Sequence, residues 1–349
     1  MKIFLPLRED NGGFVSAVQY YRGALPLLTL QNHNEGFEVV AMNSKQVSTM
    51  ANLEDKVRDK LLSDLDVYWL SRLQRKKGLD LFVKEVHSHG SKIIFDTDDD
   101  LTSEHRQLDI ENDFLATVKA VDMVTVSTPF LASRMEGHIG YKPTVLPNNL
   151  DTSWFAKSSI DSERLSDKVT VGFIGTSSHY DDWKIAEPAV RKLSNTHDVQ
   201  VLTAGYCPDY LEDIPGVKSL GGVSYPYYPG MMRQFDIVCC VLDEHDIFNH
   251  SKSSVKALEA MASARRFSNG KVGGAVPVCT DMKVYRRTVG KRNGVLIDND
   301  DWYPVLKELV EDSALRQRLA IQGHKWVRKN KDINNHYQKW GKLLRRVCD

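Results

Sequence analysis

The stretch FDIVCCVLDEHDIFNHSKSSVKALEAMA, residues 235–262, decides the fold of this chain. It begins with an apolar run, residues 235–242, that is typical of a buried strand. A short polar loop follows. Residues 249–262 then repeat apolar side chains at helical spacing, and Ser251 or Ser253 can cap that helix. The pattern predicts a strand, a loop and the start of a helix in direct succession.

Polar and cationic side chains gather at the predicted start of this helix. Free N–H groups at a helix start bind anions, and the ammonium groups of Lys252 and Lys256 add point charges. Further along, the Glu259 carboxylate can accept hydrogen bonds from paired hydroxyls. Two interpretations follow from these residues: a site for a nucleoside diphosphate with its ribose, or a core helix with a solvated polar start.

Length and composition indicate a globular protein with two domains. The chain has 349 residues, enough for two separate cores. Hydrophobic residues make up 42% and charged residues 26%, as in ordinary soluble proteins. The formal net charge is zero, and residues 1–150 hold 17 Lys and Arg against 21 Asp and Glu. These balances argue against a committed nucleic-acid binder and against a global attraction to anionic membranes.

The five cysteines show no metal-binding spacing, and we expect buried free thiols in a reducing compartment. They are Cys207, Cys239, Cys240, Cys279 and Cys348. The first residues, MKIFLPLRED, become charged too early for a signal peptide, and no apolar run approaches a membrane span. We expect a cytoplasmic protein that is soluble or peripherally associated with a membrane.

Strand-like runs alternate with helical patterns along the whole chain, which predicts an α/β fold with doubly wound parallel sheets. The predicted strands are residues 2–5, 37–41, 65–70, 92–95, 121–126 and 144–146, then 169–174, 199–204, 236–242, 276–280 and 294–297. A polar segment interrupts this alternation, so we predict a first domain over 1–148, a linker over 149–167 and a second domain over 168–330. Residues 331–349 form a final helical segment.

An acidic run, Asp98, Asp99 and Asp100, follows the predicted strand 92–95 almost directly. Ligands of open α/β sheets bind at the carboxyl ends of the strands, so these carboxylates are candidates for a cleft. A carboxylate beside an acceptor hydroxyl can polarise it or accept its proton. The alternatives are that they cap the segment that follows, or that they bind a divalent metal.

The order of motifs along the chain resembles the GT-B glycosyltransferases, in particular the retaining nucleotide-sugar transferases of family 4. The resemblance covers most of the chain. It rests on the Gly12-Gly13 loop, FDTDDDL (95–101), VDMVTVSTPF (121–130), VLPNNLD (145–151), VGFIGT (171–176), FNHSKSSVKALEAMA (248–262) and VPVCTD (276–281).

The resemblance implies a GT-B architecture, with two Rossmann-like domains whose parallel sheets face a central cleft. The first domain binds the acceptor and the second the nucleotide sugar, while the segment 331–349 packs back toward the first domain. The implied activity is transfer of a sugar from a nucleoside diphosphate sugar to a hydroxyl, with retention. No cofactor is implied, and a divalent metal is not expected because such enzymes usually neutralise the leaving diphosphate with helix dipoles and basic residues.

The resemblance also assigns roles to single residues. Glu259 matches the second glutamate of the family's E-x7-E motif, which binds ribose hydroxyls, whereas the first glutamate falls at Ser251. Thr176 stands where an arginine is common, and Lys184 is the candidate for a second basic residue. The expected donor-binding residues are Gly12, Gly13, Gly175, Thr176, Asn249, Ser251, Lys252, Ser253, Ser254, Lys256 and Glu259, and the expected catalytic residues are Asp98, Asp99 and Asp100.

Two other functions fit the same fold: a nucleotide-sugar epimerase, and a non-catalytic protein that binds a nucleotide sugar. The donor is expected to be a UDP-sugar, with a GDP-sugar as the alternative. The acceptor is open among a glycan, a lipid-linked sugar, a small molecule, a protein side chain and a hydroxylated DNA base. The basic segments 72–77 and 339–346 are candidates for contact with a membrane or with DNA.

Overall fold

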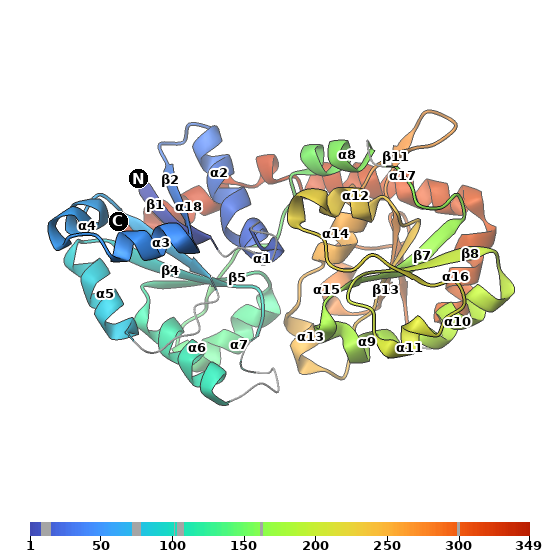
Figure 1. The fold of residues 1–349 in the computed structure, drawn as a ribbon, viewed down its shortest axis with the longest axis horizontal. Coiled ribbons are helices and arrows are strands. Elements are labelled where there is room, and N and C mark those ends of the chain that lie inside the picture. Colours follow the sequence, from blue (N-terminus) through green and yellow to red (C-terminus); the bar gives the residue numbers. More distant parts are fainter. Residues whose placement is uncertain (8–14, 72–77, 101, 103–107, 161–162, 299–300) are drawn as a thin grey trace. The chain divides into compact units, whose positions relative to one another are not determined.

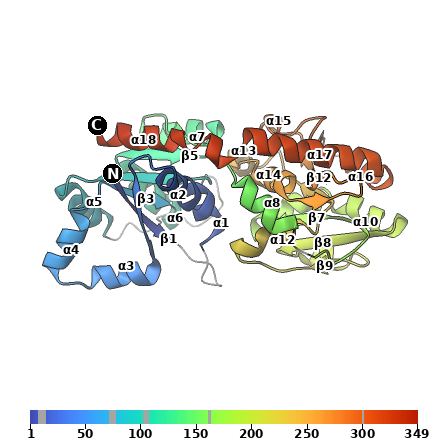
Figure 2. The same ribbon diagram turned by 90° about the horizontal axis from the view of Figure 1, so that it is seen from above.

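The structure is a computed structural model that describes the whole chain except residues 8–14, 72–77, 101, 103–107, 161–162 and 299–300. The chain divides into two compact units. The first comprises Met1–Asn149, Ser251–Ser253 and Ile333–Asp349, and the second comprises Leu150–His250 and Ser254–Asp332. Each unit has one large parallel sheet with helices on both faces (Figures 1 and 2).

The first unit is built on a six-stranded parallel sheet in the order β2-β1-β3-β4-β5-β6. Its strands are β1 (Lys2–Leu7), β2 (Glu38–Asn43), β3 (Val67–Ser71), β4 (Lys92–Thr97), β5 (Met123–Val126) and β6 (Thr144–Val145). Every strand predicted for this half of the sequence is present. The strand order reverses its direction between β1 and β3, which makes that point the topological switch of the sheet.

The helices of the first unit follow the strands in the expected alternation. They are α1 (Ala17–Gln19), η1 (Tyr20–Ala24), α2 (Leu25–Asn32), α3 (Ser44–Ala51), α4 (Asp55–Leu62), α5 (Leu79–Ser88), α6 (Leu108–Ala120), α7 (Pro129–Ile139), η4 (Ile333–Asn335) and α18 (Gln338–Cys348). The start of α7 is capped: Thr128 Oγ1 accepts a hydrogen bond from Leu131 N at 3.2 Å, and Pro129 has no N–H that would need an acceptor there. Gly140, in the left-handed conformation, ends the helix.

The helical segment that follows β1 in the described chain is divided into three pieces. A π-helical turn, Tyr20–Ala24, separates α1 from α2, and Pro26 lies in the first turn of α2. Pro26 has no N–H to donate, so the hydrogen-bond ladder is broken at this position. The wider turn carries Arg22, whose side chain is fully buried.

The second unit is built on a six-stranded parallel sheet in the order β14-β13-β10-β7-β8-β9. Its strands are β7 (Val169–Gly175), β8 (Val199–Gly205), β9 (Lys218–Ser219), β10 (Ile237–Cys240), β13 (Val276–Thr280) and β14 (Val295–Ile297). A separate antiparallel hairpin joins β11 (Arg265–Arg266) to β12 (Val272–Gly273). The sheet order is that of a Rossmann fold, with its switch point between β7 and β10.

The helices of the second unit pack on both faces of this sheet. They are α8 (Thr152–Ile160), η2 (Ser177–His179), α9 (Tyr180–Lys184), α10 (Glu187–Thr196), α11 (Asp209–Glu212), η3 (Tyr225–Tyr227), α12 (Tyr228–Met232), α13 (Ile247–Ser251), α14 (Val255–Ala262), α15 (Lys283–Arg286), α16 (Trp302–Glu311) and α17 (Ser313–Asn330). The segment predicted as a linker therefore contains a helix, α8, which buries Phe155. The sequence did not predict this helix because the segment is mostly polar and has few apolar side chains to bury.

Strand β7 passes so close to β8 that only glycine fits at position 172. A methyl group there would lie 1.7 Å from the Leu202 carbonyl oxygen and 3.0 Å from Phe235 Cε1. Gly172→Ala must separate two paired strands, so we expect it to destabilise the second unit by about 3 kcal/mol, the upper end of overpacking costs. The test is urea unfolding of the wild-type chain and of Gly172→Ala, with Gly137→Ala as the control. That methyl group meets nothing within 4 Å in α7 and is expected to stabilise by about 0.5–1 kcal/mol.

All five cysteines are free thiols, as predicted, but only three of them are buried, whereas the sequence predicts burial for all. Cys239, Cys240 and Cys279 are buried in the second unit, Cys207 is half-buried, and Cys348 is exposed. Burial raises the pKa of Cys239 and of Cys279 well above the ordinary thiol value. Separately, a search of the described residues finds no helix with the length and apolar character that crossing a bilayer requires.

Candidate functional site

The candidate site of the second unit lies at the carboxyl ends of β7 and β10, on either side of the switch point. Ligands of open α/β folds bind there because the loops after the two strands diverge and leave room between them. Gly175 ends β7, and α14 begins fifteen residues after β10. The stretch 235–262, which contains β10 and α14, therefore meets the loop after Gly175 at this edge.

Lys256 reaches from α14 to the end of β7. A methyl group on Gly175 would lie 3.1 Å from Lys256 Nζ, 2.8 Å from His179 Cδ2 and 3.1 Å from Trp183 Cζ2. Position 175 is consequently limited to glycine by close approach of side chains. Two of the predicted donor-binding residues, Gly175 and Lys256, are thus brought together.

A chain of hydrogen bonds holds the Lys256 ammonium in place. Lys256 Nζ contacts His179 Nε2, and His179 Nδ1 lies 2.6 Å from Asp182 Oδ2. The other oxygen of Asp182 accepts hydrogen bonds from Asn249 Nδ2 at 2.6 Å and from Asp243 N at 2.8 Å. Because a carboxylate only accepts, Nδ1 carries the proton of a neutral His179, and Nε2 offers its lone pair to Lys256.

His179 and Asp182 were not predicted, although a signal for them exists. Both follow the strand-ending glycine, three residues apart, so they lie on one face of the short helical segment η2–α9. Asn249 was predicted as a donor-binding residue. Its side-chain amide donates to Asp182, and all three residues, Asn249, His179 and Asp182, are buried.

The start of α14 differs from the prediction. Ser254, and neither Ser251 nor Ser253, is the N-cap residue, and no side chain caps the helix. The Ser254 hydroxyl instead lies 2.8 Å from Thr288 Oγ1. The N–H groups of the first turn have no partner within the helix, which leaves them suited to bind an anion.

Glu259 lies one turn beyond Lys256 on α14 and is buried. Its Oε2 accepts a hydrogen bond from the Tyr228 hydroxyl at 2.9 Å. Burial, and then the negative charge of Glu259, raise the pKa of Tyr228 well above its ordinary value, so the phenol keeps its proton. Tyr228 stacks on Tyr225, and Tyr225 stacks on Trp154 at a centroid distance of 5.3 Å.

The segment Ser251–Ser253 groups with the first unit. The Thr128 hydroxyl donates to the Ser251 carbonyl at 2.9 Å, and Asn148 Nδ2 donates to Ser253 Oγ at 2.9 Å. Within the described part of the chain, the buried Ser251 hydroxyl makes no hydrogen bond. Lys252 lies between these two serines.

The acidic run at the end of β4 is divided between different tasks. Asp100 is buried: its Oδ1 accepts from Thr102 N at 3.1 Å and from Thr102 Oγ1 at 2.6 Å, and its Oδ2 pairs with Arg134 Nε at 3.0 Å. The bonds to Thr102 are of the kind that the capping alternative describes, and the catalytic role of the run stays a prediction. The backbone of Asp99 is tied to Thr97, and Asp98 contributes to the electrostatic environment of Arg22.

The first unit contains a buried ion pair, Arg22 with Asp96, that the sequence pattern does not predict. Arg22 donates from Nε to Asp96 Oδ2 at 2.8 Å and from Nη2 to Asp96 Oδ1 at 2.7 Å, and both side chains are fully buried. Arg22 Nη1 also donates to Asn148 Oδ1 at 2.8 Å and to the Leu146 carbonyl. Burial lowers the pKa of Arg22, but the Asp96 carboxylate outweighs it and the net shift is upward.

The other predicted residues lie as follows. Gly12 and Gly13 are outside the described residues. The Thr176 hydroxyl lies 2.9 Å from Ser178 Oγ, directly after β7. Lys184 is on the surface, where it pairs with Asp181 at 2.8 Å and lies over the Tyr180 ring. Lys184 is therefore engaged away from Gly175.

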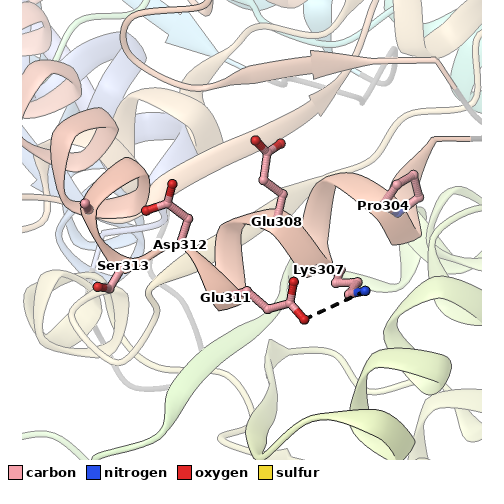
Figure 3. Close-up of a pocket in the computed structure, with 7 residues that line it drawn as sticks. Pro304, Lys307, Glu308, Glu311, Asp312 and Ser313 are labelled. Atoms are coloured by element: carbon pink, nitrogen blue, oxygen red, sulfur yellow. Dashed lines mark ion pairs between the residues drawn. The ribbon is translucent and has the colours of Figure 1, made fainter.

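A pocket elsewhere in the second unit is a poor candidate for an anionic ligand. It lies where α16 meets α17, and Figure 3 shows Glu308 and Asp312 pointing to the same side. Lys307 pairs with Glu311 at 3.8 Å, so its charge is compensated locally. The carboxylates would repel a diphosphate, and none of the predicted site residues lines this pocket. Among the described residues, no cluster of His, Cys, Asp and Glu is arranged to hold a metal ion.

Comparison with solved structures shows the same fold over almost the whole chain. The structure of HepE from Anabaena in complex with UDP-glucose has a TM-score of 0.68 at 14% identity, covering 99% of this chain and 100% of that chain. Sucrose-phosphate synthase from Thermosynechococcus elongatus has a TM-score of 0.68 at 12% identity, covering 99% of both chains. An α-glucosyltransferase in complex with UDP has a TM-score of 0.62 at 13% identity, covering 99% of both chains.

The chain therefore has the GT-B fold of glycosyltransferases, which confirms the fold that the order of motifs predicts. Its two six-stranded parallel sheets are the sheets of that architecture. No protein-family model and no curated protein matches the sequence.

Proposed function

We propose that this protein is a glycosyltransferase that moves a sugar from a nucleoside diphosphate sugar, with UDP as the nucleotide, to a hydroxyl acceptor. The observation that carries the proposal is the position of the Lys256 ammonium beside Gly175, at the switch point of a Rossmann-like sheet. Support for UDP comes from structures of the same fold that were solved with UDP or UDP-glucose.

In the proposed chemistry, the second unit binds and stabilises the leaving diphosphate. Negative charge builds up on the diphosphate as the bond to the sugar breaks, and preorganised donors aimed at that charge lower the barrier. Lys256 supplies an ammonium whose position is set by His179 and Asp182. The N–H groups in the first turn of α14, which have no acceptor within the helix, add donors that need no reorganisation.

Glu259 is proposed to bind the ribose. One carboxylate oxygen accepts from Tyr228, a protonated phenol that fixes the rotamer of the carboxylate. A carboxylate held in this way binds two neighbouring hydroxyls with little further loss of entropy. Retention of the anomeric configuration, Asp98 as a residue near the acceptor, and the remaining donor contacts at Thr176, Ser251 and Lys252 belong to the same proposal.

A thermal-shift screen against nucleotide sugars and free nucleotides tests the proposal. A ligand at about 100 times its Kd stabilises the folded protein by about 2.7 kcal/mol, so the correct donor raises the melting temperature measurably. We expect UDP and UDP-sugars to stabilise and GDP-sugars to have little effect. A panel in which no nucleotide or nucleotide sugar shifts the melting temperature contradicts the proposal.

Product analysis separates the proposed transferase from its alternatives. Incubation of the stabilising donor without an acceptor is expected to release UDP and free sugar slowly, because water replaces the acceptor. An epimerase would instead convert the donor into an isomeric nucleotide sugar, and a binding protein would leave it unchanged.

A further inference from the structure

The second unit concentrates positive charge in two short segments. The ten residues 283–292 hold five Lys and Arg, and the ten residues 322–331 hold four, with no Asp or Glu in either. The whole chain has 46 residues of each sign. A balanced total therefore conceals a strong local field. We call these two segments together the basic band.

The basic band forms the walls of a groove. One wall is the end of α15 with the loop that follows it, with Arg286, Arg287, Lys291 and Arg292, and the other is a face of α17, with Lys325 and Lys329. The groove has a volume of about 680 Å³ and contains no acidic side chain among its lining residues. Lys325 and Lys329 are four residues apart, so both project from the same side of the helix.

A second groove continues the band on the other side of α17. It is lined by Lys157, Lys271, Lys325 and Arg328, again without a carboxylate. Lys325 belongs to both grooves and joins them. The positive surface thus extends across the helix, and its length exceeds what a single phosphate group would need.

Several cations of the band have no ion-pair partner in the described part of the chain. Among the described residues, Arg286 pairs with Asp281 at 2.7 Å, whereas Arg287, Lys291, Lys325 and Lys329 make no ion pair. Like charges held close together without partners repel one another, and an anionic ligand removes that repulsion. This arrangement differs from an ordinary solvated helix face, in which acidic and basic residues alternate.

The shape and chemistry of the band favour a nucleic-acid strand over a membrane surface. A membrane-binding surface adds large apolar side chains to its cations, and the exposed large apolar residues of the described chain all lie elsewhere. A concave groove lined by arginines fits the consecutive phosphodiester groups of a nucleic-acid backbone. The planar guanidinium group of arginine can donate two parallel hydrogen bonds to one phosphate. Trp326, half-buried in the groove wall, offers a ring beside that row.

We infer that the basic band binds the phosphodiester backbone of a nucleic acid. The groove wall also contains Thr288, whose hydroxyl lies 2.8 Å from Ser254 at the start of α14. Thr288 thus connects the groove wall to the start of α14 through one hydrogen bond. The inference does not depend on the proposed function, because it concerns binding without any donor.

Fluorescence anisotropy with a labelled oligonucleotide of about 20 residues tests the inference, as a single strand and as a duplex. The band variant combines Arg287→Glu, Lys291→Glu and Lys325→Glu, three exposed positions on the groove. Its matched control reverses the same number of exposed charges in the first unit, with Lys45→Glu, Lys56→Glu and Lys84→Glu. Melting curves establish that both variants are folded.

We expect the wild-type chain to bind the oligonucleotide with an affinity that falls steeply as salt rises. The band variant should bind at least about tenfold more weakly near 100 mM salt, and its salt slope should fall by about 2, since each single-strand phosphate contact contributes roughly 0.7. The control should stay within about twofold of wild type, because its charges lie outside the groove.

Three outcomes overturn the inference. The first is that neither the single strand nor the duplex binds the wild-type chain. The second is that the control variant loses as much affinity as the band variant, which would make binding a matter of net charge. The third is that vesicles containing phosphatidylserine bind through the band residues while the oligonucleotides do not, which would assign the band to a membrane.

Discussion

Lys256→Ala is expected to reduce the rate of UDP release from the donor by about 10²–10³-fold, the loss typical of removing one preorganised donor from a developing negative charge. Lys256 is the cation that the second unit places beside Gly175, and His179 with Asp182 fixes its position. The measurement is donor turnover at saturation, with the donor identified by thermal shift. Binding of the free nucleotide should weaken much less than turnover.

Two further variants make the role of Lys256 specific. Lys307→Ala removes a surface lysine that pairs with Glu311 on α16, and it should leave turnover unchanged. His179→Ala leaves the ammonium in place but removes its orienting partner, so it should lower kcat by a smaller factor than Lys256→Ala. Equal turnover in wild type and Lys256→Ala would disprove the site assignment.

Arg22→Met is expected to destabilise the first unit by about 3–5 kcal/mol, the cost of leaving one member of a buried ion pair without its partner. The Asp96 carboxylate would lose both guanidinium hydrogen bonds and, among the described residues, keep the one from the Thr125 hydroxyl at 2.5 Å. Asn148 Oδ1 would lose its donor as well. Denaturant unfolding followed by circular dichroism measures the change.

The double variant Arg22→Met with Asp96→Leu distinguishes charge from packing. Removing both charges together takes away the uncompensated carboxylate, so most of the lost stability should return. Arg58→Met is the surface control, because Arg58 pairs with the exposed carboxylates of Asp55 at 2.8 Å and Glu85 at 3.5 Å, and such pairs contribute about 0–1 kcal/mol each. Similar losses in Arg22→Met and in the double variant would show that packing, and not the ion pair, stabilises this site.

The sequence predicts most of the fold because buried parallel strands are short apolar runs. Every strand with four or more residues in the two large sheets was predicted, whereas β9 and the hairpin β11–β12 have strands of only two residues and leave no periodic signal. Helices α3 and α4 were missed for a different reason. Of their residues only Leu62 is buried, so they lack a continuous apolar stripe.

The candidate site is predictable only where its residues are close in sequence. Lys256 and Glu259 lie on one helix and were identified together, but His179 contacts Lys256 across 77 positions, and Arg22 contacts Asp96 across 74. Such pairs depend on strand order, which spacing alone does not reveal. The same holds for the basic band, in which the fold brings together segments that separately resemble solvated helix faces and loops.

The distribution of cysteines gives each unit its own chemical reporter. Cys348 is exposed in the first unit, so alkylating reagents reach it in the folded protein. Cys239, Cys240 and Cys279 are buried in the central strands of the second unit, and burial keeps Cys239 and Cys279 as unreactive thiols. After a labelling pulse, mass spectrometry measures the fraction of molecules alkylated at these buried cysteines. That fraction reports how often the sheet of the second unit opens, without any engineered probe in the chain.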